Sequence, residues 1–206
     1  MLETDRAEEV LEETDMAFLF AQKYHSAMKN VGPVRKEMGE RTIFNILGPL
    51  TNPANASRQL LGVYDKELVE KLAEVLANLG VTRGMSVCGS DGLDEITVTG
   101  PTHCCEIKDG KLTSFEITPE QFGLSTCRLA ELVGGTPEEN AQITKDILSG
   151  TLKGAKRDVV LMNAGIGIYL GSENLTMEEG IKKAEELINS GKAYEKMEEF
   201  VKATQQ

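Results

Sequence analysis

The sequence lacks the features that mark several common classes of protein. No apolar run approaches the roughly 20 residues that a membrane-spanning helix needs. The first residues, Met1 to Arg6, are mixed in charge and have no apolar segment like that of a secretory signal peptide. No internal repeat, low-complexity tract or long linker interrupts the 206 residues. We therefore expect a cytoplasmic protein with one sizeable core and no membrane partner.

Positive charge is also in short supply. The chain has 22 Lys and Arg against 33 Asp and Glu, which gives a net charge of -11 and a pI near 4.8. The electrostatic field of such a negatively charged protein disfavours unselective binding to nucleic acid. It does not exclude a phosphorylated substrate, because backbone N–H groups, a few local cations and a magnesium ion can hold one.

Metal-binding cysteine and histidine patterns are absent as well. The four cysteines form no C-x-x-C pair, so their spacing does not fit a zinc site, and we expect buried, reduced thiols. They are Cys88, Cys104, Cys105 and Cys127. There are only two histidines, and no motif surrounds His103, which we interpret as structural.

The central part of the chain predicts a sheet. Leu60 to Tyr64 and Met85 to Cys88 are apolar strand candidates on either side of an amphipathic helix from Lys66 to Leu79, which favours parallel pairing. Three further segments alternate like strands: 95–99, 102–107 and 112–117. Residues 108–111 predict a hairpin turn between the last two. We therefore expect an α/β fold with a mixed central sheet flanked by helices.

Helices are predicted elsewhere. Thr136 and Thr176 each begin a capping box, and proline follows the first of them. The apolar segment Val159 to Leu170 has the wrong glycine spacing for a dinucleotide site and predicts a buried helix whose glycines permit close packing. Other helices are expected at 6–13, 26–38, 42–47 and from residue 192 onward.

Two clusters of polar residues stand out. The segment from Arg41 to Pro53 ends in two predicted turns, Gly48-Pro49 and Asn52-Pro53, and its neutral polar side chains suit a small planar ligand. Ordinary caps and turns would give the same pattern. Asp94 and Glu95 are adjacent acids, with Asp91 close in sequence, and Mg²⁺ prefers such oxygen ligands. The alternative is a solvated turn.

Four segments in this order resemble the anthranilate phosphoribosyltransferase family, from about Ala7 to Val201. They are FLFAQKYHSAM at 18–28, PVRK at 33–36, RTIFNILGPLTNP at 41–53 and GSDGLDEIT at 89–97. The resemblance implies transfer of a phosphoribosyl group from phosphoribosyl pyrophosphate to anthranilate, giving N-(5-phosphoribosyl)anthranilate and pyrophosphate in tryptophan biosynthesis. It also implies an oxocarbenium-like transition state and no protein nucleophile.

The resemblance implies roles for particular residues. Arg35 contacts the anthranilate carboxylate, which a guanidinium fork matches with two hydrogen bonds. His25 lines the entrance for anthranilate, and Ser26 stands where the family usually has proline. The full set implied for anthranilate is His25, Arg35, Gly48, Pro49 and Asn52. Asp94 and Glu95 are the implied ligands of Mg²⁺.

Two loops of the family, Gly-Thr-Gly-Gly-Asp and Lys-His-Gly-Asn, do not occur in this sequence. In the family, these two loops make most of the contacts that bind the pyrophosphate. We therefore expect the C-terminal portion of the enzyme, weakly active or inactive alone, with residues 26–50 belonging to a small helical subdomain that also mediates homodimerisation in the family.

Three alternatives remain open at this point. A pyrimidine nucleoside phosphorylase shares the fold, although the residues at 45–53 and the acid pair disfavour it. A split subunit or non-catalytic binding module would act only with a separate chain. An incomplete gene model would also explain the missing loops.

Overall fold

The computed structural model describes residues 4–20, 24, 37, 39 and 44–205. Its contacts divide the chain into two units. Residues 56–192 contain every described strand, and we call them the sheet unit. Residues 1–55 and 193–206 form the second, and we call it the helical unit because all its described elements are helices.

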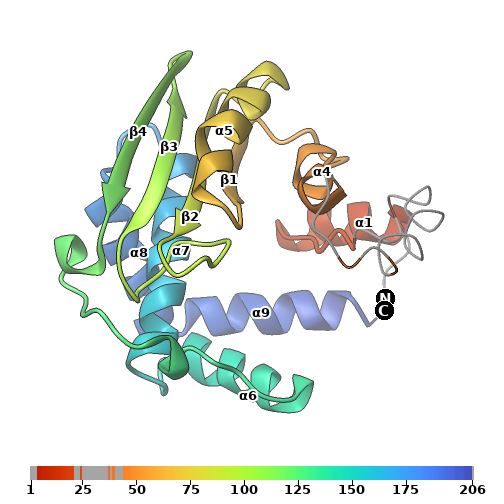
Figure 1. The fold of residues 1–206 in the computed structure, drawn as a ribbon. Helices are drawn as coiled ribbons and strands as arrows, with labels where there is room; N and C mark the ends of the chain where they lie inside the picture. The colour runs from red at the N-terminus through yellow and green to blue at the C-terminus, as the bar shows by residue number, and fades with distance from the viewer. Residues whose placement is uncertain (1–3, 21–23, 25–36, 38, 40–43, 206) are drawn as a thin grey trace. The chain divides into compact units, whose positions relative to one another are not determined.

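The sheet unit is built on four strands in the order β1-β2-β3-β4 (Figure 1). Their bounds are Arg58–Gly62, Arg83–Gly89, Thr102–Lys108 and Lys111–Ile117. β1 and β2 are parallel, whereas β2–β3 and β3–β4 are antiparallel. The predicted mixed sheet is therefore confirmed.

The crossover between the parallel strands is the predicted helix. A 3₁₀ turn, η1 (Lys66–Leu68), leads into α5 (Val69–Asn78). Asp65 caps the turn by accepting a hydrogen bond from the backbone N–H of Glu67 at 2.9 Å. The buried side chains of α5, Leu72 and Leu76 among them, pack on β2 and β3. Apolar spacing thus placed this helix correctly.

The hairpin between β3 and β4 is also confirmed. Asp109 and Gly110 lie at its tip with φ values of 50° and 71°. Both are in the left-handed region, which a tight two-residue hairpin requires. This geometry explains why a short polar residue and a glycine stand there.

The strand predicted at 95–99 is wrong. These residues form part of the irregular connection between β2 and β3. The backbone N–H and C=O of Ile96 bond to the side chain of Asn163, and the N–H of Thr97 bonds to the Thr102 hydroxyl. Side chains therefore supply the hydrogen bonds that a neighbouring strand would otherwise make to this backbone.

Two helices, α7 (Ala155–Gly171) and α8 (Met177–Asn189), pack against each other, and α7 packs on β1 and β2. Every residue of β2 is buried, because α5 covers one face of the strand and α7 the other (Figure 1). A Cβ at Gly165 would lie 2.4 Å from Ile181 Cγ1, and one at Gly180 would lie 2.3 Å from the Gly165 carbonyl oxygen. The predicted buried helix with close-packing glycine is confirmed.

Both predicted capping boxes are present. Thr136 and Thr176 accept hydrogen bonds from the N–H groups of Glu139 and Glu179 at 3.3 and 3.2 Å, and both glutamates bond back at 2.7 Å. They begin α6 (Pro137–Leu148) and α8. The remaining turns of the sheet unit are η2 (Pro119–Phe122) and η3 (Leu129–Glu131).

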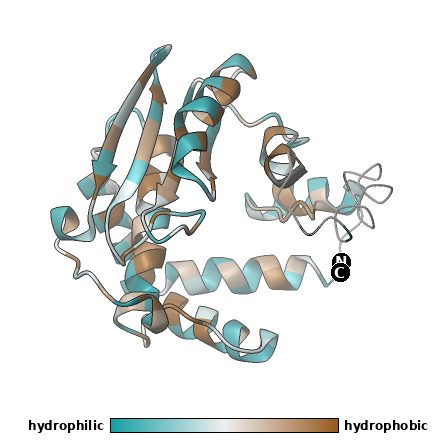
Figure 2. Cartoon of the chain, viewed as in Figure 1, coloured by the Kyte–Doolittle hydropathy of each residue, from teal (hydrophilic) through white to brown (hydrophobic). Residues whose placement is uncertain are grey.

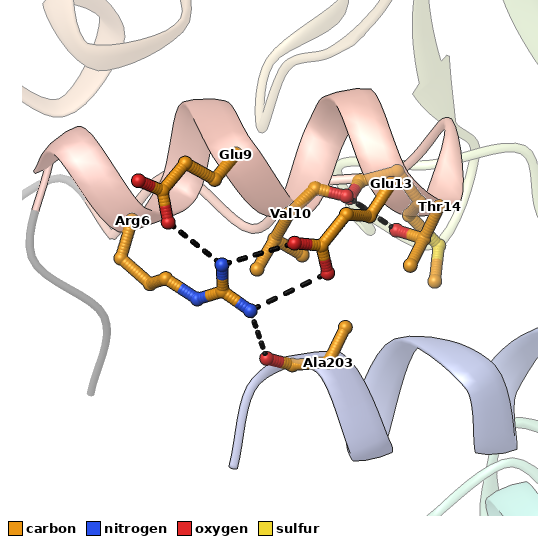
Figure 3. A network of polar contacts seen from close by, with 7 residues as sticks. Arg6, Glu9, Val10, Glu13, Thr14 and Ala203 are labelled. Atoms are coloured by element: carbon orange, nitrogen blue, oxygen red, sulfur yellow. Dashed lines mark hydrogen bonds and ion pairs between the residues drawn. The ribbon is translucent and has the colours of Figure 1, made fainter. Parts of the chain in front are cut away.

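The helical unit contains α1 (Thr4–Thr14), α4 (Phe44–Leu50) and nearly all of α9 (Lys192–Ala203). Hydrophilic and hydrophobic bands alternate along α9 in Figure 2. Arg6 joins α1 to the end of α9, donating to Glu9 at 2.7 Å, to Glu13 at 3.1 Å and to the Ala203 carbonyl oxygen at 2.9 Å (Figure 3).

Two helix predictions in this unit have different outcomes. The helix at 26–38 falls almost entirely outside the described residues. The helix at 42–47 is found as α4, which continues to Leu50 and includes Gly48 and Pro49 in its last turn. The predicted break at Gly48-Pro49 is therefore wrong, because the fixed φ of proline is compatible with a helix. No described helix is both long and apolar enough to cross a membrane.

Candidate functional site

The connection between β2 and β3, which we call the acidic loop (residues 90–101), carries the predicted metal pair. Backbone hydrogen bonds close it at its base. The N–H of Ser90 donates to Pro101 O and the N–H of Gly89 donates to Leu93 O, both at 2.9 Å. The loop is irregular but fixed by these bonds.

Asp91 organises the interior of the loop. Its Oδ2 accepts hydrogen bonds from the hydroxyls of Thr97 at 2.7 Å and Thr99 at 2.5 Å, and its Oδ1 accepts from the N–H of Leu93 at 3.0 Å. A Cβ at Gly89 would lie 2.4 Å from Asp91 Oδ1, so glycine leaves room for this carboxylate. Asp91 therefore has a structural role.

The environment of Asp91 favours its ionised form. Burial acts to raise the pKa of Asp91, but the hydrogen bonds from Thr99, Thr97 and the Leu93 backbone outweigh it, and the pKa lies below its usual value. The loop is thus held by a charge that persists at neutral pH.

Asn163, on α7, holds the other side of the loop. Its Oδ1 accepts from the N–H of Ile96 at 3.0 Å and its Nδ2 donates to Ile96 O at 2.8 Å. Nδ2 also donates to Val159 O at 2.9 Å and lies 3.4 Å from Glu95 Oε2. These contacts fix the orientation of the amide, because exchanging its O and N would set oxygen against two carbonyls.

Asp94 and Glu95 are both exposed on this loop. Among the described residues, neither forms an ion pair with a lysine or arginine. Partial desolvation of its carboxyl group raises the pKa of Glu95, and the charges of Asp94 and Asp91 raise it further. Adjacent carboxylates that repel each other and lack a cation fit a divalent ion.

The donor set has room for other ligands. Within the described residues, no three His, Cys, Asp or Glu side chains are grouped to hold a metal. Mg²⁺ needs only one or two carboxylates, since water and substrate phosphate complete its octahedron. Asp94 and Glu95 therefore fit Mg²⁺ better than a metal that requires a full cage of protein ligands.

The parallel strand pair positions this loop. A Cβ at Gly62, the last residue of β1, would lie 1.6 Å from Asp94 O and 2.5 Å from its carbonyl carbon. The acidic loop thus packs directly on the carboxyl end of β1 and continues from that of β2. Ligands of α/β proteins commonly bind at such ends.

The polar segment of the helical unit forms caps and a turn. The hydroxyl of Thr51 donates to Leu47 O at 2.8 Å at the end of α4. Asn52 Oδ1 accepts from the N–H of Ala54 at 3.0 Å, and the N–H of Asn55 donates to Asn52 O at 3.2 Å. Gly48 is half-buried, whereas Pro49 and Asn52 are exposed. The turn predicted at Asn52-Pro53 is confirmed.

His25 and Arg35, the other residues implied for anthranilate, lie outside the described residues. Their roles stay predictions. The structure therefore places Gly48, Pro49 and Asn52 in the helical unit, and Asp94 and Glu95 together in the sheet unit.

The second histidine, His103, lies on β3, and all four cysteines belong to the sheet unit. His103 Nδ1 contacts Glu116 Oε1 at 2.8 Å beside an open groove of about 550 Å³ between α5 and the β3–β4 hairpin. Ser114, which also lines this groove, donates to Glu70 at 2.6 Å. All four thiols are free and three are buried, and burial raises the pKa of Cys104 to about 12.

Residues 1–194 match the model of the glycosyl transferase family, a/b domain. The chain belongs to this family. An anthranilate phosphoribosyltransferase of Endomicrobium trichonymphae is 53% identical over 204 residues, which cover 99% of this chain and 60% of that protein. The chain thus spans about three-fifths of the length of this curated relative of the family.

Two solved structures of the same kind share the fold. Anthranilate phosphoribosyltransferase from Thermus thermophilus matches with a TM-score of 0.90 and 41% identity, over 98% of this chain and 59% of that one. The Saccharomyces cerevisiae enzyme, in complex with PRPP and Mg, matches with a TM-score of 0.89 and 33% identity, over 98% and 58%. Another structure of the yeast enzyme contains 4-fluoroanthranilate. The α/β fold is therefore that of these family members.

Sequence reasoning missed two residues of the acidic loop's support. Asn163 is a polar residue within the apolar segment 159–170, and that contrast was a usable signal. Gly62 gave none, because a glycine near the end of a strand has many explanations. Its role depends on a contact with a residue 32 positions away in the sequence.

Proposed function

We propose that this chain forms part of an anthranilate phosphoribosyltransferase. The reaction would transfer the phosphoribosyl group of phosphoribosyl pyrophosphate to the amine of anthranilate and release pyrophosphate. The relatives named above support this proposal, together with the bound PRPP, Mg and 4-fluoroanthranilate of the yeast structures. Tryptophan biosynthesis is the corresponding pathway.

The observation that carries the proposal is the acid pair of the acidic loop. Asp94 and Glu95 are adjacent, exposed and without an ion pair among the described residues, on a loop fixed by Asp91 and Asn163. In the proposed reaction they hold Mg²⁺. When bound, Mg²⁺ neutralises charge on the pyrophosphate as it leaves.

The proposed anthranilate site draws on the helical unit. Arg35 pairs with the carboxylate of anthranilate, and His25 lines its entrance. Gly48-Pro49 offers a flat apolar surface to the ring, and Asn52 a polar group beside it. Pro49 and Asn52 are both exposed, which supports this role because a ligand can reach them.

Positioning and charge neutralisation carry most of the catalysis in this proposal. The amine of anthranilate is itself the nucleophile, so no side chain needs to form a covalent intermediate. This agrees with buried thiols whose pKa values are raised, since thiolates are the reactive form of cysteine.

An assay with anthranilate, phosphoribosyl pyrophosphate and Mg²⁺ tests the activity of the 206-residue chain. We expect little or no turnover alone, because the loops that grip pyrophosphate in the family are absent from this sequence. Adding a protein that contains those loops should restore activity. Turnover by the chain alone comparable to that of a full-length relative would contradict this expectation.

Binding distinguishes the leading alternative. A pyrimidine nucleoside phosphorylase would bind thymidine, whereas the proposed enzyme binds anthranilate. We expect anthranilate to be bound and Arg35→Ala to weaken it more than Lys36→Ala, the matched neighbouring cation. Saturable binding of thymidine in place of anthranilate would favour the phosphorylase.

A split subunit, which would act only together with a separate chain, is the second alternative. Co-purification of a separate chain bearing the missing loops would support it. We also propose a cytoplasmic location and, for the assembled enzyme, a homodimer whose helical subdomain includes residues 26–50.

A further inference from the structure

Asn163, on α7, contacts the acidic loop through both ends of its amide. One end accepts from the N–H of Ile96 and the other donates to the carbonyl of the same residue, at 3.0 and 2.8 Å. This paired contact imitates a neighbouring strand at a single residue. It holds the backbone immediately after Glu95.

The same amide reaches Glu95 itself. Nδ2 lies 3.4 Å from Glu95 Oε2, a long contact that leaves the carboxylate free to accept another partner. Val159 O, one helical turn earlier, takes a further hydrogen bond from Nδ2 at 2.9 Å and ties the amide to α7. Rotation of the Asn163 side chain would break all of these contacts together.

The backbone before Glu95 packs on Gly62, and the backbone after it is held by Asn163. Ile96 is fully buried, so its backbone polar groups have no access to water as a substitute partner. Asp91, the other organiser of the loop, bonds to Thr97, Thr99 and Leu93 and not to Glu95. Among the described residues, Asn163 is the side chain that contacts both the Glu95 carboxylate and the backbone that follows it.

We infer that Asn163 is a positioning residue, whose amide fixes the backbone at Ile96 so that the Glu95 carboxylate is presented to a divalent cation. The inference rests on the proposed function. Partners that orient metal ligands typically change metal affinity by about 10–100-fold when they are removed. Asn163 would act through Glu95 without touching the ion.

The test measures binding of Mn²⁺, a paramagnetic substitute for Mg²⁺, to the 206-residue chain. Free Mn²⁺ is followed by electron paramagnetic resonance in the presence of phosphoribosyl pyrophosphate. We expect Asn163→Ala to raise the dissociation constant by about tenfold or more. Leu161→Ala, which removes a buried side chain of the same helix, is the control for lost stability and should leave the constant unchanged.

A second variant separates position from charge. Asn163→Asp keeps the shape and the acceptor for the Ile96 N–H, but it replaces the donor and adds a negative charge near Glu95. If only the added negative charge mattered, Mn²⁺ would bind more tightly. If the Glu95 carboxylate is no longer held in position, Mn²⁺ binds more weakly. We expect weaker binding, and tighter or unchanged binding would overturn the inference even if Asn163→Ala fails to fold.

Hydrogen exchange at the Ile96 amide provides a readout independent of metal. Exchange should accelerate in Asn163→Ala and stay close to the original rate in Leu161→Ala. Continued protection of this amide in Asn163→Ala would show that other groups hold the loop and would overturn the inference.

Glu95→Gln separates the metal-binding role of Glu95 from the positioning role of Asn163. If it weakens Mn²⁺ binding while Asn163→Ala does not, the inference fails and the proposed metal role stands. If Glu95→Gln has no effect, or if the unsubstituted chain binds no Mn²⁺, the metal role itself fails and the role of Asn163 falls with it.

Discussion

At the scale of single residues, the acidic loop is held by groups that restrict one another's movement. Asp91 is encircled by three donors, Asn163 clamps Ile96, and Gly62 admits the backbone of Asp94. These buried contacts position the exposed acid pair. Substitutions at Asp91, Asn163 or Gly62 should therefore change the position of the two carboxylates without changing their chemistry.

Gly62→Ala should disrupt the loop. The added methyl would lie 1.6 Å from Asp94 O, which is backbone and cannot rotate away. Overpacking of this kind costs about 1–3 kcal/mol or more of unfolding free energy. Urea denaturation checks the stability, with Gly171→Ala as control because its methyl would meet nothing within 4 Å. Equal midpoints for the two variants would contradict the packing argument.

Asp91→Asn should destabilise the chain in a pH-dependent manner. The pKa of Asp91 is lowered in the folded state, so its ionised form stabilises the fold above the unfolded value of roughly 3.9. This contribution is lost as pH falls through the lower folded pKa. At pH 7 we expect a loss of about 1.5–3 kcal/mol from hydrogen bonds to a charged group.

The measurement is the urea midpoint of both proteins from neutral pH downward. Their midpoints should differ most at pH 7 and converge once Asp91 is protonated in the folded state. A difference that stays constant over the whole range would show that the charge of Asp91 contributes nothing.

At the scale of elements, the pair α7–α8 depends on the contact between Gly165 and Gly180. The backbone of each helix fills the space where the other would carry a side chain. Because α7 also packs on β1 and β2, this contact sets the position of the helix that carries Asn163. The contact between α7 and α8 therefore also affects the acidic loop, because α7 carries Asn163.

Two substitutions on α7 should have opposite signs. Gly165→Ala would place a methyl 2.5 Å from Ile181 Cα and should lower the unfolding free energy by about 1–3 kcal/mol. Gly167→Ala is exposed and meets nothing within 4 Å, so it should raise stability by up to about 1 kcal/mol through helix propensity. Thermal unfolding of both variants checks the signs, and two losses of equal size would contradict the explanation.

At the scale of the whole molecule, the chain consists of two units. The described elements of the helical unit are all helices, whereas the sheet unit contains strands and helices. The described candidates for anthranilate, Gly48, Pro49 and Asn52, belong to the helical unit, and the candidate metal residues belong to the sheet unit. Among the residues of the helical unit that the structure describes, three large apolar side chains are exposed: Leu11, Phe18 and Val201. Phe18 is 67% exposed and stacks on Phe20 with ring centroids 6.3 Å apart.

The isolated chain should therefore self-associate. Exposed aromatic and aliphatic side chains are a common cause of association when no partner covers them. Size-exclusion chromatography with light scattering measures the mass, and Phe18→Ser should reduce association relative to Phe115→Ser, a control in the sheet unit. A stable, monodisperse monomer of the unsubstituted chain would contradict this prediction.

The local elements of this protein could be predicted from its amino-acid sequence. Apolar spacing identified α5, capping boxes marked the starts of α6 and α8, and Asp109-Gly110 marked the hairpin, because each depends on residues only a few positions apart. The mixed order of the sheet followed from the strand–helix–strand unit and this hairpin. The adjacency of Asp94 and Glu95 was also visible at once.

The way in which the acid pair is held depends on contacts between segments that are far apart in the sequence. Residues 95–99 alternate like a strand, but Asn163, far along the chain, supplies the hydrogen bonds that a strand would have needed. The continuation of α4 through Pro49 and the contact of Gly62 with Asp94 likewise left no pattern in the sequence. Local patterns record what neighbouring residues prefer, whereas contacts between distant segments depend on packing, and packing fixes the acidic loop.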